Sequence, residues 1–270
     1  LYRAQWIGIE GAPQTATFTA DMPVNGERVG VGLQLSNDKV GLINQTGAYL
    51  TYAFRLKLGE RSTLAMGLQG GAMSYRVNYA EAMLAPGGVG PVDPAFAQNV
   101  SKILPNFGTG LYLSNDRGYL GLSVPYLLKS KLSDFEGANG NNRSLLRRHA
   151  YATAGLVVGL SPTIKIKPSF LAKYAEGAPL GFDGNVNIWF NDRIAIGTSF
   201  RKNQFYSWTN DSNDAIVGLI ELQVSDQLRL GYAYDRTLNN LRAYGPDSHE
   251  FMLRYEFGFG KSKILTPRYF

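Results

Sequence analysis

The chain contains no cysteine, only two histidines and three tryptophans, and a low share of charged residues, 18%. Without cysteine it has neither a disulfide framework nor a thiolate metal site. No uninterrupted apolar run reaches the length of about 18 residues that a membrane-spanning helix needs. Dense Lys/Arg runs of the kind that bind nucleic acid are also missing, although the net charge is +6. A transmembrane β-barrel passes all these tests, because its strands carry only every second residue to lipid.

What is present is strict alternation, seen most clearly in the hairpin between Asp214 and Asp235. Its second arm places Leu228, Leu230, Tyr232 and Tyr234 on one face and Arg229, Gly231, Ala233 and Asp235 on the other. Successive side chains of a strand point to opposite faces, so this arm is a strand with one apolar face. Ser225–Gln227 between the arms is a short turn.

The same pattern recurs along the whole chain and predicts about 14 strands. We expect them at Tyr2–Trp6, Gln14–Met22, Arg28–Ser36, Ala48–Leu58, Thr63–Tyr75, Phe107–Ser114, Tyr119–Tyr126, Ala150–Ser161, Thr163–Tyr174, Phe182–Phe190, Arg193–Arg201, Ala215–Val224, Leu228–Asp235 and Glu250–Phe259. The segment Arg76–Asn106 is rich in Pro and Gly and is not expected to form a strand, although Asp93–Leu104 can hold a short helix.

Short and long connections alternate between these strands. The short ones include Gly59–Ser62, Asn115–Gly118 and Asn191-Asp192, whereas Asn37–Gly47 and Lys129–Arg148 are expected to be longer loops. An up-and-down outer-membrane barrel has short periplasmic turns and long outer loops, whereas a soluble sandwich or propeller has no reason to keep one side tight. We therefore expect an all-β, single up-and-down antiparallel transmembrane β-barrel over residues 1–270, with both termini periplasmic and 260–270 as a periplasmic tail.

Residues with catalytic or metal-binding chemistry form no recognisable motif. His149 and His249 lie at the edges of expected strands, and no local pattern pairs either with a nucleophile or carboxylate. Asn210–Asp214 lacks the Gly and Glu of an EF-hand calcium loop. We expect no catalytic residue, no cofactor and no metal, and therefore no enzyme.

Charged residues on the non-apolar faces are expected to point into the barrel. They are Arg55, Lys57, Lys165, Lys167, Lys173, Arg201, Arg229, Glu250, Arg254 and Glu256. Two interpretations stay open: the charges pair with one another and fill the lumen, or they line an anion-preferring pore.

Two groups of residues are candidates for partner contacts. Loop aromatics are usual anchors on a rigid scaffold, and here they are Phe205, Tyr206, Trp208 and Tyr244. The basic tail after the last strand ends in Pro267, Arg268, Tyr269 and Phe270. Because Pro267 lacks the N–H needed for ladder pairing, we expect the tail to enter the barrel's periplasmic mouth or to bind a partner.

Several short motifs at the two ends resemble one family. Tyr2-Arg-Ala-Gln-Trp6 with Gly11–Thr15, and His249–Phe257 with Pro267–Phe270, are similar to the PorP/SprF membrane proteins of the type IX secretion system. Gly30–Gly32 and Tyr52–Arg55 add to this resemblance, which spans essentially the whole length. The family's usual Asn-Pro-containing start is absent before Arg3, which is consistent with trimming ahead of Leu1.

The resemblance implies a non-enzymatic barrel in the outer membrane of a Gram-negative bacterium that exports proteins, and sometimes glides, by the type IX system. The implied partners are other type IX secretion proteins, the C-terminal domain of a secreted cargo or adhesin, and outer-membrane lipid, with no nucleic acid. The alternatives are an outer-membrane porin or small-solute channel and, further off, a barrel enzyme such as a lipase. Ion conductance in bilayers distinguishes the first alternative, and loss of activity on changing His149 or His249 distinguishes the second.

Overall fold

A computed structural model describes residues 1–24, 26, 28–79, 99–132, 145–202, 215–238 and 247–257. Its first half contains β1 (Tyr2–Ala4), β2 (Gln14–Val24), β3 (Val29–Val40), β4 (Ile43–Lys57), β5 (Thr63–Val77), β6 (Val100–Ser114), β7 (Gly118–Val124), β8 (Ser130–Lys131) and β9 (Leu145–Leu146). Its second half contains β10 (His149–Leu156), β11 (Val158–Gly159), β12 (Ile164–Ala175), β13 (Gly181–Phe190), β14 (Ile194–Lys202), β15 (Ala215–Gln223), β16 (Leu228–Thr237) and β17 (Asp247–Tyr255).

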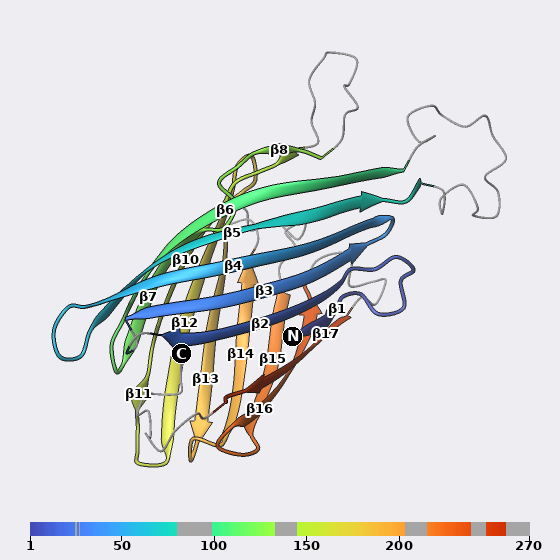
Figure 1. Cartoon of the computed structure of the whole chain (residues 1–270). Coiled ribbons are helices and arrows are strands. Elements are labelled where there is room, and N and C mark those ends of the chain that lie inside the picture. Colours follow the sequence, from blue (N-terminus) through green and yellow to red (C-terminus); the bar gives the residue numbers. More distant parts are fainter. Residues whose placement is uncertain are drawn as a thin grey trace.

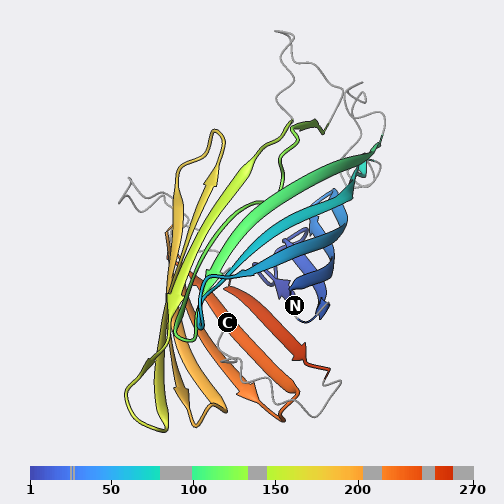
Figure 2. The same ribbon diagram turned by 60° about the vertical axis from the view of Figure 1, so that its left-hand side comes forward.

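The strands close into one antiparallel barrel, as Figures 1 and 2 show from two directions. Most strands pair with their neighbours in the chain, and β1 lies between β2 and β17. The exceptions in the barrel are that β7 pairs with β10 and that both β10 and β11 pair with β12, while β8 and β9 form a separate two-stranded sheet. The segments β10 and β11 follow one another along β12 and are separated opposite Pro168, which has no N–H to donate. Counted this way the barrel has fourteen strands, so the predicted fold class and strand number are confirmed.

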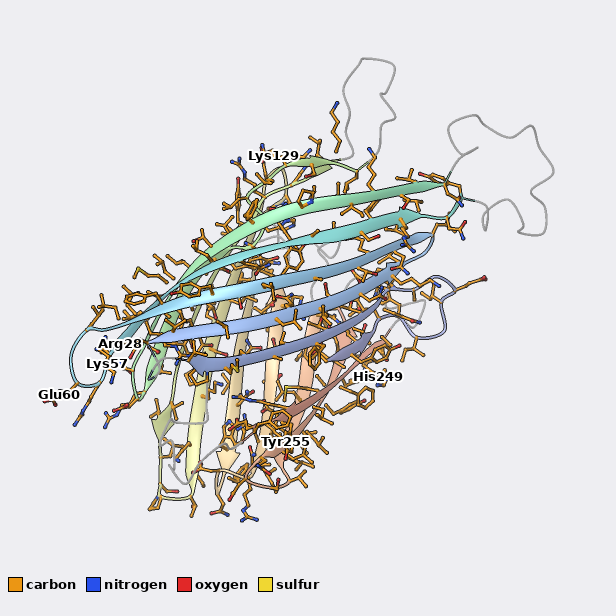
Figure 3. The ribbon with its side chains drawn as sticks, in the orientation of Figure 1. Arg28, Lys57, Glu60, Lys129, His249 and Tyr255 are labelled. Atoms are coloured by element: carbon orange, nitrogen blue, oxygen red, sulfur yellow. The ribbon has the colours of Figure 1, made fainter. Side chains whose placement is uncertain are left out.

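Most of the tight turns lie at one end of the barrel, which we call the turn end, and the opposite end, the loop end, includes one tight turn between β3 and β4. At the turn end, Asn191 and Asp192 have left-handed φ angles of 49° and 57° in the three-residue connection between Phe190 and Ile194, and Arg193 N donates to Phe190 O at 3.0 Å. Asn115 Oδ1 accepts hydrogen bonds from the backbone N–H groups of Arg117 and Gly118 at 2.9 and 2.8 Å. Figure 3 places Arg28, Lys57 and Glu60 at the turn end and Lys129 at the loop end.

The outer face of the barrel is apolar along its middle. Outward side chains such as Leu50, Leu68 and Leu253 expose 64–67% of their area, the arrangement that lipid requires. On β16, Leu230 is exposed whereas Arg229 and Asp235 are buried on the inner face, so the predicted register is confirmed. No helix among the described residues is long and apolar enough to cross a membrane.

One predicted loop is wrong because two strands continue past the apolar band of the outer face. Asn37–Gly47 is not a long connection, since β3 reaches Val40 and β4 starts at Ile43. Gly41, at φ +54°, makes the tight turn between them. Asn37 donates hydrogen bonds of 2.9 Å to the side chains of Asn44 and Thr46 across this ladder. The polar residues that suggested a loop are therefore outward side chains of a paired strand.

The start of β6 is a second correction. Residues Val100–Asn106 belong to strand β6, so the prediction that Arg76–Asn106 contains no strand is wrong for these residues. The predicted short helix in Asp93–Leu104 is wrong for Val100–Leu104 for the same reason. Residues 80–98 of the segment lie outside the described residues. The backbone oxygen of Phe107 accepts a hydrogen bond from Leu127 N, so the backbone polar groups of Phe107 point toward the β7 side. The ladder between β6 and β7 ends at Thr109, so Pro105 has no partner strand on that side. Because residues i and i+2 point their N–H groups to the same side, Pro105 costs no ladder bond.

Smaller differences concern strand ends. The predicted loop Lys129–Arg148 contains the two-stranded β8–β9 sheet, β1 ends at Ala4 before Trp6, and β17 begins at Asp247 rather than Glu250. Asn106, which is fully buried, fixes the start of the β7–β8 connection. Its side chain accepts from Leu128 N at 3.0 Å and donates to Leu128 O at 2.9 Å.

Large aromatic side chains on the inner face lie over glycines of the next strand. Tyr119 pairs with Gly155, and a Cβ at Gly155 would lie 2.6 Å from Cε1 of Tyr119. Tyr119 also stacks on Tyr112 with 5.5 Å between the ring centroids. The glycine therefore provides the space for the ring.

Replacing Gly155 with alanine is expected to lower the free energy of unfolding by about 1–3 kcal/mol through overpacking. In a Tyr119→Ala background the same replacement is expected to cost nearly nothing, because the three atoms nearest to the new Cβ all belong to Tyr119. Urea unfolding in detergent micelles measures both values. The control is Gly184→Ala, where nothing lies within 4 Å of the added Cβ. An equal penalty in both backgrounds would contradict this account.

Candidate functional site

The inner wall carries a continuous chain of ion pairs across six strands. We call it the inner ion-pair chain, and its members in order are Lys173, Asp183, Arg201, Asp235, Arg3 and Glu250. The N···O separations along it are 2.9, 3.4, 2.8, 2.9 and 4.0 Å. Three cations alternate with three carboxylates, so the chain is formally neutral.

Strand register explains how these charges meet. Asp183 and Arg201 are direct cross-strand partners on β13 and β14, as are Arg3 and Glu250 on β1 and β17. The Arg201–Asp235 pair spans β15, whose inward residues beneath it are the small, buried Ala215 and Val217. Asp235 is the centre of the chain, because its Oδ2 accepts from both Arg3 and Arg201.

A second set of inward charges lies nearer the turn end. Arg229 is 3.5 Å from Glu221, donates to Gln223 Oε1 at 2.8 Å, and places its Cζ 4.8 Å from the centroid of the Trp189 ring. Lys165 pairs with Asp192 at 2.8 Å, and Arg254 with Glu256 at 3.1 Å. Arg229 is the buried member of this set, and its charge is held in place by its partners.

The predicted inward charges within strands lie on the inner side of the strand register, and most of the predicted set form ion pairs with residues of opposite charge. Arg55 and Lys57 are exposed near the turn end and form no ion pair with another described residue. Lys167 lies on the inner face opposite Asn187. Two interpretations of these charges were left open. Paired charges along the wall explain the arrangement better than an anion-preferring pore, which would need a surface of positive charge. The sequence pattern missed Arg3, Asp183 and Glu221 as partners, although all three stand at inward positions of alternating strands.

Apolar side chains fill the inner wall at the loop end. Met73, Tyr75 and Val77 of β5 are buried together with Leu104 of β6. Leu132 and Leu146, next to and within the β8–β9 sheet, pack against them. On β5 the inward residues change from small to large at Met73, which is the sequence signal for this cluster.

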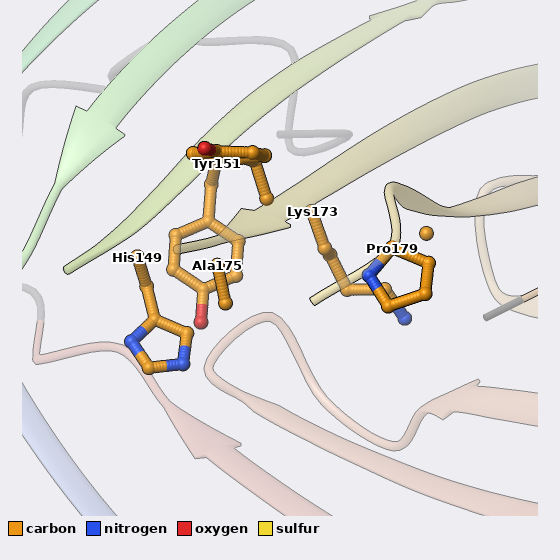
Figure 4. Close-up of a pocket in the computed structure, with 7 residues that line it drawn as sticks. His149, Tyr151, Lys173, Ala175 and Pro179 are labelled. Atoms are coloured by element: carbon orange, nitrogen blue, oxygen red, sulfur yellow. The ribbon is translucent and has the colours of Figure 1, made fainter. Parts of the chain in front are cut away.

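A pocket of about 220 Å³ lies beside this end, between the start of β10 and the β12–β13 connection. Its wall consists of His149, Tyr151, Lys173, Tyr174, Ala175, Pro179 and Gly181. Figure 4 shows His149, Tyr151 and Lys173 around it. The His149 and Tyr151 rings are nearly parallel, at 12° and 6.4 Å, and His149 Nδ1 lies 3.0 Å from Arg147 O.

The other histidine lies on the outside of the barrel. His249 Nδ1 is 2.7 Å from the Tyr232 hydroxyl, and Tyr234 meets its ring edge-on. Tyr234 donates a hydrogen bond to Asp247. These outward aromatic and polar groups are typical of the girdle at a membrane interface. Within the described part of the chain, no three His, Asp or Glu side chains lie close enough together to hold a metal ion.

The predicted partner contacts lie outside the described residues. These are Phe205, Tyr206, Trp208 and Tyr244 in the loops and Pro267, Arg268, Tyr269 and Phe270 in the tail. The pocket and the inner ion-pair chain are therefore the sites that the structure adds to the prediction.

A closed antiparallel barrel with an apolar outer face and paired charges inside is a transmembrane β-barrel of the outer-membrane type. The family model for the type IX secretion system membrane protein PorP/SprF matches residues 1–255. The chain belongs to this family, so the resemblance noted in its end motifs is confirmed.

Solved structures with a similar fold include porins and channels. A FadL homologue of Pseudomonas aeruginosa has 17% identity and a TM-score of 0.49, with 90% of this chain and 78% of that chain covered. The CymD monoaromatic hydrocarbon channel has 10% identity and a TM-score of 0.49, with 96% and 89% covered. The KdgM porin has 8% identity and a TM-score of 0.39, with 95% and 98% covered. A search of curated protein sequences found no match.

Proposed function

We propose that this barrel is a non-enzymatic component of the type IX secretion machinery that binds a secreted cargo protein or a surface adhesin at its loop end. In this proposal the loop end faces the cell exterior, and the turn end and both termini face the periplasm. The turn end and the tail after β17 contact periplasmic partners of the machinery. A role in gliding follows where the cargo is a motility adhesin.

One observation carries this proposal: the groups suited to binding gather at the loop end. The pocket beside His149, the basic side chains Lys129, Arg147 and Arg148, and the apolar cluster around Met73 all lie there. The charges farther inside are mostly occupied with one another. Family membership supports the secretion role, since the chain matches PorP/SprF over residues 1–255.

Replacing Phe205, Tyr206 and Trp208 together with alanine is expected to reduce cargo recovery more than about tenfold, because aromatic anchors in interfaces are often worth about 2 kcal/mol each. The measurement is affinity purification of the tagged barrel from native outer membranes, with quantification of co-purifying proteins. Recovery of periplasmic partners is expected to stay unchanged in this variant. Deleting Thr266–Phe270 is expected to have the reverse effect, losing periplasmic partners and keeping cargo.

Bilayer recordings of the purified barrel test the alternative of a porin or small-solute channel. Large, stable conductance together with the absence of any specific co-purifying protein would contradict the proposal. Unchanged recovery in both variants would instead show that the aromatic loop and the tail are not the contact sites.

A further inference from the structure

The rim beside the pocket carries three cations around a single carboxylate. Lys129 Nζ donates to Glu176 Oε1 at 2.7 Å, Arg147 Nη1 donates to Glu176 O at 3.2 Å, and Arg148 Nε donates to Leu127 O at 2.9 Å. The hydrogen bond from Lys129, and then the charges of Lys129, Arg147 and Arg148, hold the pKa of Glu176 below its usual value despite partial desolvation. We call these four residues the basic rim.

The basic rim has donors to spare. Each arginine uses one N–H group in the contacts above, and a guanidinium has five. The remaining N–H groups suit a carboxylate, which arginine binds with two parallel hydrogen bonds. An incoming anion also meets a local excess of positive charge, since among the described residues Glu176 is the one carboxylate that contacts these three cations.

The pocket lies next to the basic rim, because its lining residues are neighbours of rim residues in the chain. His149 follows Arg148 in the chain, and Ala175 and Pro179 flank the connection that holds Glu176. The His149 and Tyr151 rings form one wall, with Tyr126 edge-on to His149 at 6.5 Å. Lys173 forms part of the lining, but its Nζ already binds both oxygens of Asp183, at 2.9 and 3.1 Å. The pocket therefore has an aromatic wall, and the charge of its lining residue Lys173 is already paired, unlike the excess charge of the rim.

The size of the pocket limits the class of ligand. At about 220 Å³ it is smaller than the roughly 300–1,000 Å³ sites that enclose a drug-sized molecule. The pocket is large enough for one side chain of a larger partner, and other groups of that partner would contact the basic rim. A sugar ring needs several hydrogen-bond partners for its hydroxyls, and Lys173 is engaged with Asp183.

We propose that the basic rim and the pocket together bind an acidic peptide segment, with carboxylates on Arg147 and Arg148 and a neighbouring aromatic side chain against His149 and Tyr151. This inference rests on the proposed function, because the segment is taken to belong to the cargo or adhesin. It adds the chemistry of recognition: acidic side chains flanking an aromatic one.

The probe is a fluorescein-labelled peptide, Gly-Glu-Phe-Glu-Gly, whose binding to the purified full-length barrel in detergent micelles is followed by anisotropy. Its counterpart Gly-Gln-Phe-Gln-Gly is expected to bind at least about tenfold more weakly. Added salt is expected to weaken the acidic peptide most, because salt screens exposed charges. Equal binding of the two peptides would overturn the proposal.

Three variants locate the site. Arg147→Gln with Arg148→Gln is expected to lower affinity for the acidic peptide about tenfold, whereas Arg61→Gln with Arg117→Gln, an equal charge change at the turn end, leaves it unchanged. Glu176→Gln is expected to raise affinity about two- to fivefold, a gain that misfolding cannot produce. Tyr151→Ala is expected to remove the preference for Gly-Glu-Phe-Glu-Gly over Gly-Glu-Gly-Glu-Gly while keeping the salt dependence.

The remaining outcomes separate this inference from the proposed function. Tighter binding of polygalacturonate, lost in the Arg147 and Arg148 variant, would replace the peptide with an anionic polysaccharide and overturn the proposal. If that variant still recovers cargo from native membranes at the wild-type level, the peptide site is wrong while cargo binding stands. If the unmodified barrel recovers no cargo, the proposed function fails whatever the peptides do.

Discussion

Asp235→Asn is expected to lower the free energy of unfolding by about 3–5 kcal/mol, the usual cost of removing one partner from a buried ion pair. Asp235 is 8% exposed, and its Oδ2 accepts from Arg3 at 2.9 Å and from Arg201 at 2.8 Å. Asparagine keeps the shape of the side chain but leaves two guanidinium groups facing each other without the charge between them. The measurement is urea unfolding in detergent micelles, followed by the gel mobility of the folded barrel.

The matched control for this prediction is Glu60→Gln at an exposed turn. It removes the same charge and is expected to change the free energy of unfolding by less than about 0.5 kcal/mol, as is usual for surface substitutions. In an Arg3→Met background the loss from Asp235→Asn is expected to shrink, because contacting residues do not contribute independently. A loss that is the same in both backgrounds would show that Asp235 acts apart from Arg3.

The periodicity of the sequence was enough to predict the barrel and the face of each strand. Leu228, Leu230 and Tyr232 alternate with Arg229 and Gly231, and a shift by one residue would place Arg229 in lipid. Each short turn joins two strands that are neighbours both in the chain and in the sheet, as at Asn191-Asp192. Local signals therefore fix most of the topology of an up-and-down barrel.

Strand length was harder to predict, because the outer face is apolar only where it meets lipid. Asn37, Asn44 and Thr46 lie on the outer face of β3 and β4 beyond the apolar band, and polar residues there resemble a loop. The Pro- and Gly-rich composition of Arg76–Asn106 gave a similar false signal at the start of β6. Both errors come from taking polar residues and proline as signs that a segment lacks strand hydrogen bonds. Whether those bonds form depends on the neighbouring strands.

The partners of the inward charges could not be predicted, because alternation gives the face of a residue and not its neighbours around the barrel. Arg3 and Asp235 are separated by 232 positions in the chain and meet only because β1 lies beside β17. The pocket has the same origin, since His149 begins β10 whereas Pro179 lies in the connection between β12 and β13. The loop aromatics Phe205, Tyr206 and Trp208 stay a prediction from sequence.

Gly71→Ala is expected to block assembly of the barrel or to cost about 4 kcal/mol or more, which is exceptional for one methyl group. Gly71 pairs with Tyr49, whose ring is 2% exposed and lies over it. A Cβ at Gly71 would lie 2.1 Å from Ala48 O, 2.7 Å from Tyr49 Cα and 2.7 Å from Tyr49 Cδ1. Two of these three atoms belong to the backbone of β4, so relief requires β4 and β5 to move apart.

Gly67→Ala is the control, because it adds the same methyl group to the same face of the same strand. Its nearest neighbour would be Gly110 O at 3.7 Å, an ordinary contact, so we expect normal folding yield and little change in the free energy of unfolding. Tyr49→Ala should not rescue Gly71→Ala, unlike the Tyr119–Gly155 pair, because the clash with Ala48 O remains. Folding yield and urea unfolding measure all three variants. Full rescue by Tyr49→Ala would mean that the ring, rather than the approach of the two backbones, excludes a side chain at position 71.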